Sequence, residues 1–95
     1  MKTLDIAEYL QTEEDCRVFL QEVADTGDVD EFIHALGIVA RAKGMSKIAE
    51  TIGVGRTSLY KSLSENGNPS FETVFKVLNA MGFKLSFVPT SLSEV

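Results

Sequence analysis

The spacing of apolar residues along the chain predicts a mainly helical protein. Between residues 12 and 82, apolar residues recur three and four positions apart, which is the spacing of one face of an α-helix. Capping residues, glycines and a proline divide this region into separate segments. The helices expected from these signals cover residues 12–26, 28–43, 46–52, 56–63 and 71–81.

Residues with strong local preferences mark where these helices begin and end. Thr12 and Asp28 are each followed three residues later by an acid, which is typical of a capped helix start. Ser46 has a hydroxyl suited to capping the third helix. We expect Gly44 and Gly53 to end the second and third helices, because glycine takes a left-handed conformation without a Cβ penalty.

The two ends of the chain carry other patterns. Residues 1–11 are compatible with either a short helix or an extended arm. Residues 83–88 alternate, with Phe83, Leu85 and Phe87 on one face of a predicted strand. A single strand leaves its backbone groups without partners. Its candidate partners are the N-terminal arm and the same strand of a second copy, and we favour a homodimer.

The formal net charge of −5 hides a division along the chain. Residues 1–34 contain ten acids and two cations, whereas residues 35–61 contain five cations and one acid. The local charge of a surface, rather than the total, decides whether that surface suits nucleic acid. Residues 35–61, in the middle of this acidic chain, are therefore basic enough to bind nucleic acid.

Other kinds of chemistry have little support. Cys16 is the only cysteine, at a spacing typical of a buried position, and His34 is the only histidine. Together they provide no thiolate pair or imidazole cluster for a metal. No base and nucleophile stand at a suggestive spacing, and no stretch approaches the roughly 20 apolar residues of a membrane span. We therefore expect a cytoplasmic protein without enzymatic activity or cofactor.

The stretch MSKIAETIGVGRTSLYKSL, residues 45–63, has the features of a helix-turn-helix. Ala49 is small where the two helices would touch, and Gly53 can turn the chain. We expect Val54 to fill the core after the turn and Leu59 to anchor the second helix from below. The alternative is a plain helical hairpin with a solvated cationic face.

The outward face of the second helix favours DNA. On a helical wheel, Leu59 points inward, and the outward side chains are Arg56, Thr57, Tyr60 and Lys61. Arginine pairs with guanine edges, and the other three side chains can reach bases or phosphates. Lys47 lies where the first helix would cross the DNA backbone. Turn spacing, outward groups and local charge together favour DNA binding over the plain hairpin.

The block ALGIVARAKGMSKIAETIGVGRTSLYKSLSENGNPSFETVFKVLNAMGFKL, residues 35–85, resembles the lambda-repressor-like (Cro/CI-type) helix-turn-helix domains. Its distinctive part, GRTSLYKSLSENGNPSFETVFKVLNAMG, more narrowly resembles the addiction-module antidote family, small proteins encoded beside RelE/HigB-like toxins. The acidic opening LDIAEYLQTEED also looks like the start of that family. The resemblance implies a transcriptional autorepressor that binds operator DNA and neutralises a cognate toxin.

The resemblance also implies which residues contact DNA. The reading helix of the family carries over onto Arg56, Thr57, Tyr60 and Lys61, with Ser58 as a phosphate contact. The loop that follows carries over onto Asn66, Gly67 and Asn68, either as a phosphate contact or as an ordinary turn. Gly55 departs from the usual family pattern, which puts the start of the reading helix in doubt.

The resemblance gives the acidic first third a use as well. RelE-like toxins tend to be basic, and complementary charge raises the rate and selectivity of association. The alternative is that these acids only solvate the outer faces of two helices. Two other functions stay open: a stand-alone Cro/CI-type repressor without a toxin partner, and an interaction module that has lost DNA.

The predicted fold class is therefore all-α, a five-helix lambda-repressor-like helix-turn-helix domain with a short C-terminal strand. We expect a single domain with three parts. They are an acidic N-terminal arm and helix (1–27), a helix-turn-helix DNA-binding core (28–82), and a C-terminal strand and tail (83–95).

Overall fold

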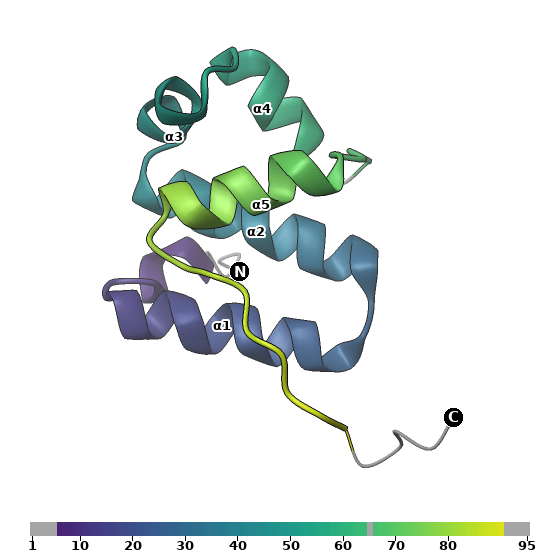
Figure 1. The fold of residues 1–95 in the computed structure, drawn as a ribbon. Helices are drawn as coiled ribbons and strands as arrows, with labels where there is room; N and C mark the ends of the chain where they lie inside the picture. Colours follow the sequence, from purple (N-terminus) through teal and green to yellow (C-terminus); the bar gives the residue numbers. More distant parts are fainter. Residues whose placement is uncertain (1–5, 65, 91–95) are drawn as a thin grey trace, which may run out of the picture.

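The computed structural model describes residues 6–64 and 66–90, and this part of the chain is all-helical (Figure 1). A 3₁₀ helix, η1 (Ile6–Tyr9), precedes five α-helices. Their bounds are α1 Glu13–Thr26, α2 Val29–Lys43, α3 Met45–Ile52, α4 Arg56–Ser62 and α5 Phe71–Ala80. The predicted all-α class and its five helices are confirmed. The predictions for the arm over residues 1–5 and the tail over residues 91–95 lie outside the described residues.

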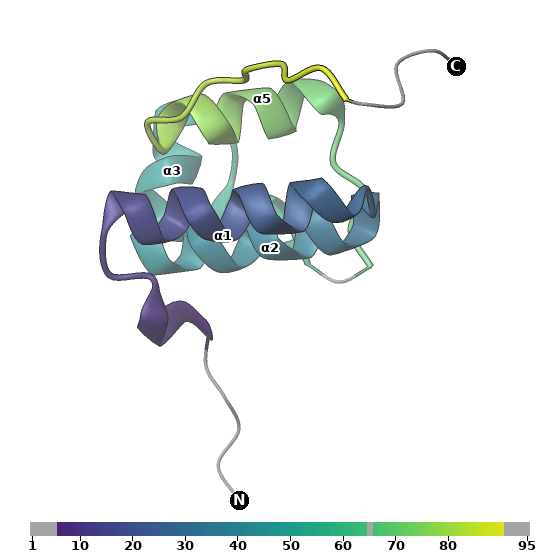
Figure 2. The ribbon, with the colours of Figure 1, turned by 90° about the horizontal axis from the view of Figure 1, so that it is seen from below.

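The helices pack around one core. α1 and α2 run antiparallel side by side, and α5 lies on one face of this pair (Figure 2). α3 and α4 lie beyond α2, on the side away from α1 (Figure 1). All five helices contribute to the buried cluster, which comprises Cys16, Leu20, Ala35, Leu36, Val39, Ala40, Met45, Ile48, Ala49, Leu59, Leu63, Val77, Leu78 and Met81.

Helix starts follow the capping pattern of the sequence at two of the three predicted positions. At α1, the Asp15 N–H donates to Thr12 Oγ1 (3.0 Å) and the Thr12 N–H donates to Asp15 Oδ2 (3.1 Å), a complete capping box. Asp28 Oδ1 accepts from the N–H of Glu31 at the start of α2. The predicted Ser46 cap is wrong. Gly44 both ends α2 and starts α3, so that Ser46 already lies inside α3.

A glycine within α2 sets how closely that helix approaches the end of α4. Gly37 is buried, and a Cβ built on it would lie 2.4 Å from the backbone oxygen of Leu63. Real Cβ atoms essentially never lie so close to another heavy atom, so only glycine fits without a shift of backbone. Gly37 therefore lets Leu63 enter the core directly against α2.

The predicted C-terminal strand is wrong, because residues 83–90 form no strand. The Phe83 N–H donates to the Leu78 carbonyl (2.9 Å), which closes α5, and Phe83 packs against the core. Leu85 is partly exposed and Phe87 is 90 % exposed, so the three side chains do not form one buried face. A strand needs a partner for its backbone groups, and the described part of this chain provides none.

Several apolar residues are exposed, and one of them was expected in the core. Val54, expected to fill the core after the turn, is 41 % exposed, because it lies in the turn itself, with its N–H bonded to the Ala49 carbonyl. On α5, the apolar residues Phe71 and Phe75 are both exposed, with ring centroids 6.0 Å apart. Val29, the first residue of α2, is exposed as well.

Candidate nucleic-acid interface

A tight turn joins α3 to α4 and sets how the two helices are oriented relative to each other. Gly53 takes a left-handed conformation (φ 80°), and its N–H donates to the Ala49 carbonyl (2.9 Å). Ala49 is buried in the core. The turn at Gly53 is therefore confirmed, and the small residue before it is an interior one.

Two leucines fix which side of α4 faces outward. Leu59 is 1 % exposed and Leu63, which follows the helix, is fully buried. Since α4 has seven residues and no side-chain cap, these anchors hold it in place. All five predicted DNA-binding positions of α4 are accordingly exposed: Arg56, Thr57, Ser58, Tyr60 and Lys61.

The outward side chains of α4 line two shallow hollows. The first is lined by Arg56, Thr57, Tyr60 and Lys61. The second lies where the end of α2, the start of α3 and the face of α4 meet, and is lined by Arg41, Gly44, Met45, Ser46, Lys47, Arg56 and Tyr60. Three cations from three helices are thereby brought to one place. Phosphate groups are bound by such clusters of cations.

Arg41 and Tyr60 make a contact that sequence reasoning missed. The guanidinium carbon of Arg41, in the last turn of α2, lies 5.7 Å from the centroid of the Tyr60 ring. This distance is within the range of a cation–π interaction. Arg41 is one of the five cations of residues 35–61, but its contact with Tyr60 depends on the angle between α2 and α4. No local signal encodes that angle.

The loop after α4 does not reach either hollow. Asn66 and Asn68 are exposed, but neither lines the surface around Tyr60. The Gly67 N–H donates to the Ser64 carbonyl (2.9 Å), and a Cβ at Gly67 would lie 2.1 Å from the Ser62 carbonyl oxygen. The turn interpretation of this loop therefore has a structural basis, while its phosphate contact stays a prediction.

Three cations around the hollow between α2, α3 and α4 have no ion-pair partner within the part of the chain that the structure describes. Ion pairs among the described residues join Arg17 to Glu14, Lys43 to Glu13 and Lys76 to Glu72. None of these pairs includes Arg41, Lys47 or Arg56, so the three cations have no described carboxylate within ion-pair distance. Their charge is therefore available to an anionic partner.

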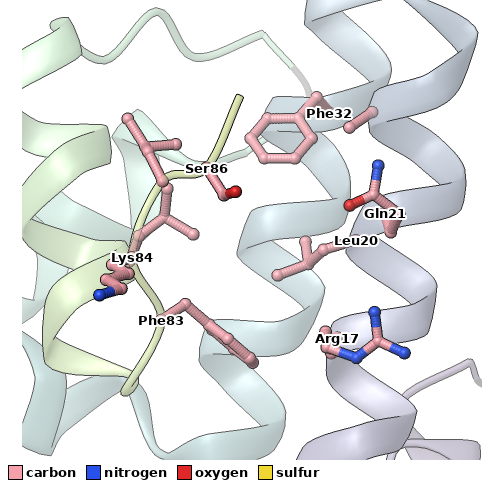
Figure 3. Close-up of a pocket in the computed structure, with 10 residues that line it drawn as sticks. Arg17, Leu20, Gln21, Phe32, Phe83, Lys84 and Ser86 are labelled. Carbon is pink, nitrogen blue, oxygen red and sulfur yellow. The ribbon is translucent and has the colours of Figure 1, made fainter. Parts of the chain in front are cut away.

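A second surface, separate from the nucleic-acid candidate on α4, lies between α1 and the C-terminal segment. Its hollow is apolar at the centre, where Leu20, Phe32 and Phe83 converge, and Arg17 and Lys84 lie at its edge (Figure 3). The first turn of α1 beside it is acidic, and the hydrogen bond from Arg17 lowers the pKa of the Glu14 carboxyl. This surface lies across α2 from α4 (Figure 1).

The described residues contain neither a metal-binding cluster nor a membrane-spanning helix. No group of three or more His, Cys, Asp or Glu side chains in residues 6–64 and 66–90 is placed to hold a metal ion. Over the same ranges, no helix has the length and hydropathy to cross a membrane.

Comparisons with known proteins identify the family. Residues 1–89 match the family described as "probable addiction module antidote protein". An uncharacterised protein of Haemophilus influenzae is 42 % identical over 84 residues, which cover 88 % of this chain and 87 % of that protein. No solved structure matches the chain. On the strength of a match that spans nearly every residue, this chain belongs to the addiction module antidote family.

Proposed function

We propose that this protein is the antitoxin of a type II toxin–antitoxin module. It binds operator DNA as a transcriptional autorepressor and neutralises a RelE/HigB-like toxin in the cytoplasm. The observation that carries the DNA-binding half is the exposed face of α4, where Arg56, Thr57, Tyr60 and Lys61 project from a helix anchored by Leu59. The toxin-neutralising half rests on the family.

In this proposal α3, the turn and α4 act as a lambda-repressor-like helix-turn-helix. α4 enters the major groove, where Arg56 pairs with a guanine and Tyr60 and Lys61 reach neighbouring bases or phosphates. Lys47, exposed in the first turn of α3, contacts a backbone phosphate. Asn66 and Asn68 follow the groove edge as phosphate contacts.

We extend the proposal to a homodimer formed through the segment of Phe83, Leu85 and Phe87. Leu85 and Phe87 are exposed apolar side chains of one short segment, and exposed apolar surface is typical of interaction sites. A symmetric dimer would place its two α4 helices about 34–36 Å apart on an inverted-repeat operator. Sedimentation of wild type and Phe87→Ser at micromolar concentration tests this, and a monomeric wild type would exclude it.

DNA binding is tested with the DNA upstream of the protein's own gene and with a scrambled duplex of equal length. Arg56→Ala should weaken operator binding by about 1–3 kcal/mol while leaving the scrambled duplex nearly unaffected. Arg17→Ala, which removes an exposed arginine from α1, is the matched control and should bind like wild type. Equal losses on both duplexes would make Arg56 a phosphate contact, and no binding by wild type would refute this half.

The phosphate role of Lys47 has a separate test. Lys47→Ala should reduce the slope of log affinity against log salt by about one unit for each site. Lys76→Ala removes a lysine that pairs with Glu72 on α5 and should leave the slope unchanged. Equal slopes for wild type and Lys47→Ala would remove Lys47 from the interface.

Toxin binding is tested by gentle purification of the tagged protein from its host, followed by mass spectrometry. A stoichiometric, small, basic partner is expected. Glu22→Lys on α1 should weaken that complex more than Glu50→Lys on α3, because both glutamates are exposed but only Glu22 belongs to the acidic third. Operator binding without any partner would instead indicate a stand-alone repressor.

A further inference from the structure

We propose that Arg41 is a specificity-determining positioning residue for Tyr60. By holding the tyrosine ring against the end of α2, Arg41 fixes where the hydroxyl of Tyr60 can reach within the DNA groove. This inference rests on the proposed DNA binding and goes beyond it, since it assigns selectivity to a residue outside the reading helix.

The geometry supplies one defined contact for an otherwise exposed side chain. Tyr60 is 46 % exposed, and Arg41 lies 5.7 Å from its ring centroid. Among the described residues, Tyr60 has a cation–π contact with Arg41 and is not part of the aromatic pair on α5. Both residues line the same hollow, together with Lys47 and Arg56. Arg41 is therefore the group placed to limit rotation of the ring.

Such a limit matters because hydrogen bonds to base edges are directional. A tyrosine free to change its rotamers presents its hydroxyl to several positions, whereas a held ring presents it to one. A guanidinium can lie over an aromatic face and still direct N–H groups along its edges. Arg41 can thus orient Tyr60 while its N–H groups remain available to donate hydrogen bonds.

The alternative role for Arg41 is a phosphate contact that is independent of Tyr60. The two roles differ in what happens when the ring is removed. A positioning residue loses its effect in the absence of Tyr60, whereas a phosphate contact keeps it. They also differ in the free protein, because only the positioning role predicts that loss of Arg41 changes the surroundings of the ring before any DNA is added.

The first test needs no DNA. The chain has no tryptophan and two tyrosines, so in a Tyr9→Phe background Tyr60 is the only strong emitter. Arg41→Ala in this background should raise the acrylamide quenching of Tyr60 fluorescence and lower its anisotropy, and Arg41→Lys should restore part of both. Arg17→Ala should change neither. Identical quenching of the parent and Arg41→Ala would overturn the proposal, whatever the outcome of DNA binding.

The second test is a double-mutant cycle on the operator. Arg41→Ala should lose about two- to fivefold more affinity in wild type than in a Tyr60→Ala background, and should relax the preference at a single base position. Equal losses in both backgrounds, with a reduced salt slope, would make Arg41 a phosphate contact and overturn the inference. If wild type binds no operator, the proposed function fails, while the fluorescence test still reports on the ring.

Discussion

Replacing Gly37 by alanine should destabilise the protein, although helix propensity alone predicts the opposite. Within a helix, alanine is favoured over glycine by about 1 kcal/mol. At Gly37, however, the new Cβ would lie 2.4 Å from the Leu63 carbonyl oxygen and 3.3 Å from the Leu63 Cβ. Overpacking of this kind costs about 1–3 kcal/mol. The net expectation is a loss of about 1 kcal/mol, or about 4–8 °C in Tm.

The measurement is thermal and urea unfolding followed by circular dichroism, with a reference taken from the same helix. His34 is exposed on α2, so the difference between His34→Ala and His34→Gly reports the propensity term without a packing term. Gly37→Ala should have a lower Tm and a lower free energy of unfolding than wild type. His34→Ala should instead be more stable than His34→Gly. In the proposed DNA-binding role, the Gly37→Ala change should also weaken operator binding, because moving Leu63 away from α2 moves the end of α4.

A stabilising effect of Gly37→Ala, equal to the alanine–glycine difference at position 34, would refute the reasoning. It would mean that no close approach between α2 and Leu63 exists in solution. The placement of α4 against the core would then have to be wrong, and with it the outward direction assigned to Arg56 and Tyr60.

Other changes probe the core, the caps and the buried thiol. Leu59→Ala should lower the free energy of unfolding by about 2–5 kcal/mol, because Leu59 is fully enclosed, and urea unfolding measures it. Thr12→Ala should cost about 0.5–2 kcal/mol through loss of the capping box at α1; a change within error would show that this box is not formed. Cys16 is buried and burial raises the pKa of its thiol, so iodoacetamide should modify the native protein slowly and the urea-unfolded protein rapidly; fast native modification would contradict the burial.

The helices and their inward faces could be predicted because their signals are local. Capping at Thr12, the turn at Gly53 and the burial of Leu59 depend on residues within a few positions of each other. The exposure of the α4 face follows from the same periodicity. These features required no knowledge of how distant helices meet.

The remaining features depend on how distant parts of the chain pack against each other, and they could not be predicted from the sequence. The role of Gly37 depends on Leu63, and the contact of Arg41 with Tyr60 depends on the angle between α2 and α4. The alternation around Leu85 indicated a strand, but periodicity cannot tell whether a partner strand is present. The same limit applies to Phe71, whose spacing fits the helix while its face meets no described neighbour closely enough to bury it.

The brevity of α4 also limits how this protein can diverge. Of its seven residues, Leu59 is buried in the core. Gly55 precedes the helix and Leu63 follows it, and these two residues fix where it starts and ends. In the proposed DNA-binding role, a lineage that acquires a new operator can therefore vary only a few outward positions, chiefly 56, 57, 60 and 61. Related modules in one genome would draw on this small set of combinations. Avoiding cross-talk between them would then favour changes in supporting residues such as Arg41, which in the proposed positioning role would alter selectivity without occupying a reading position.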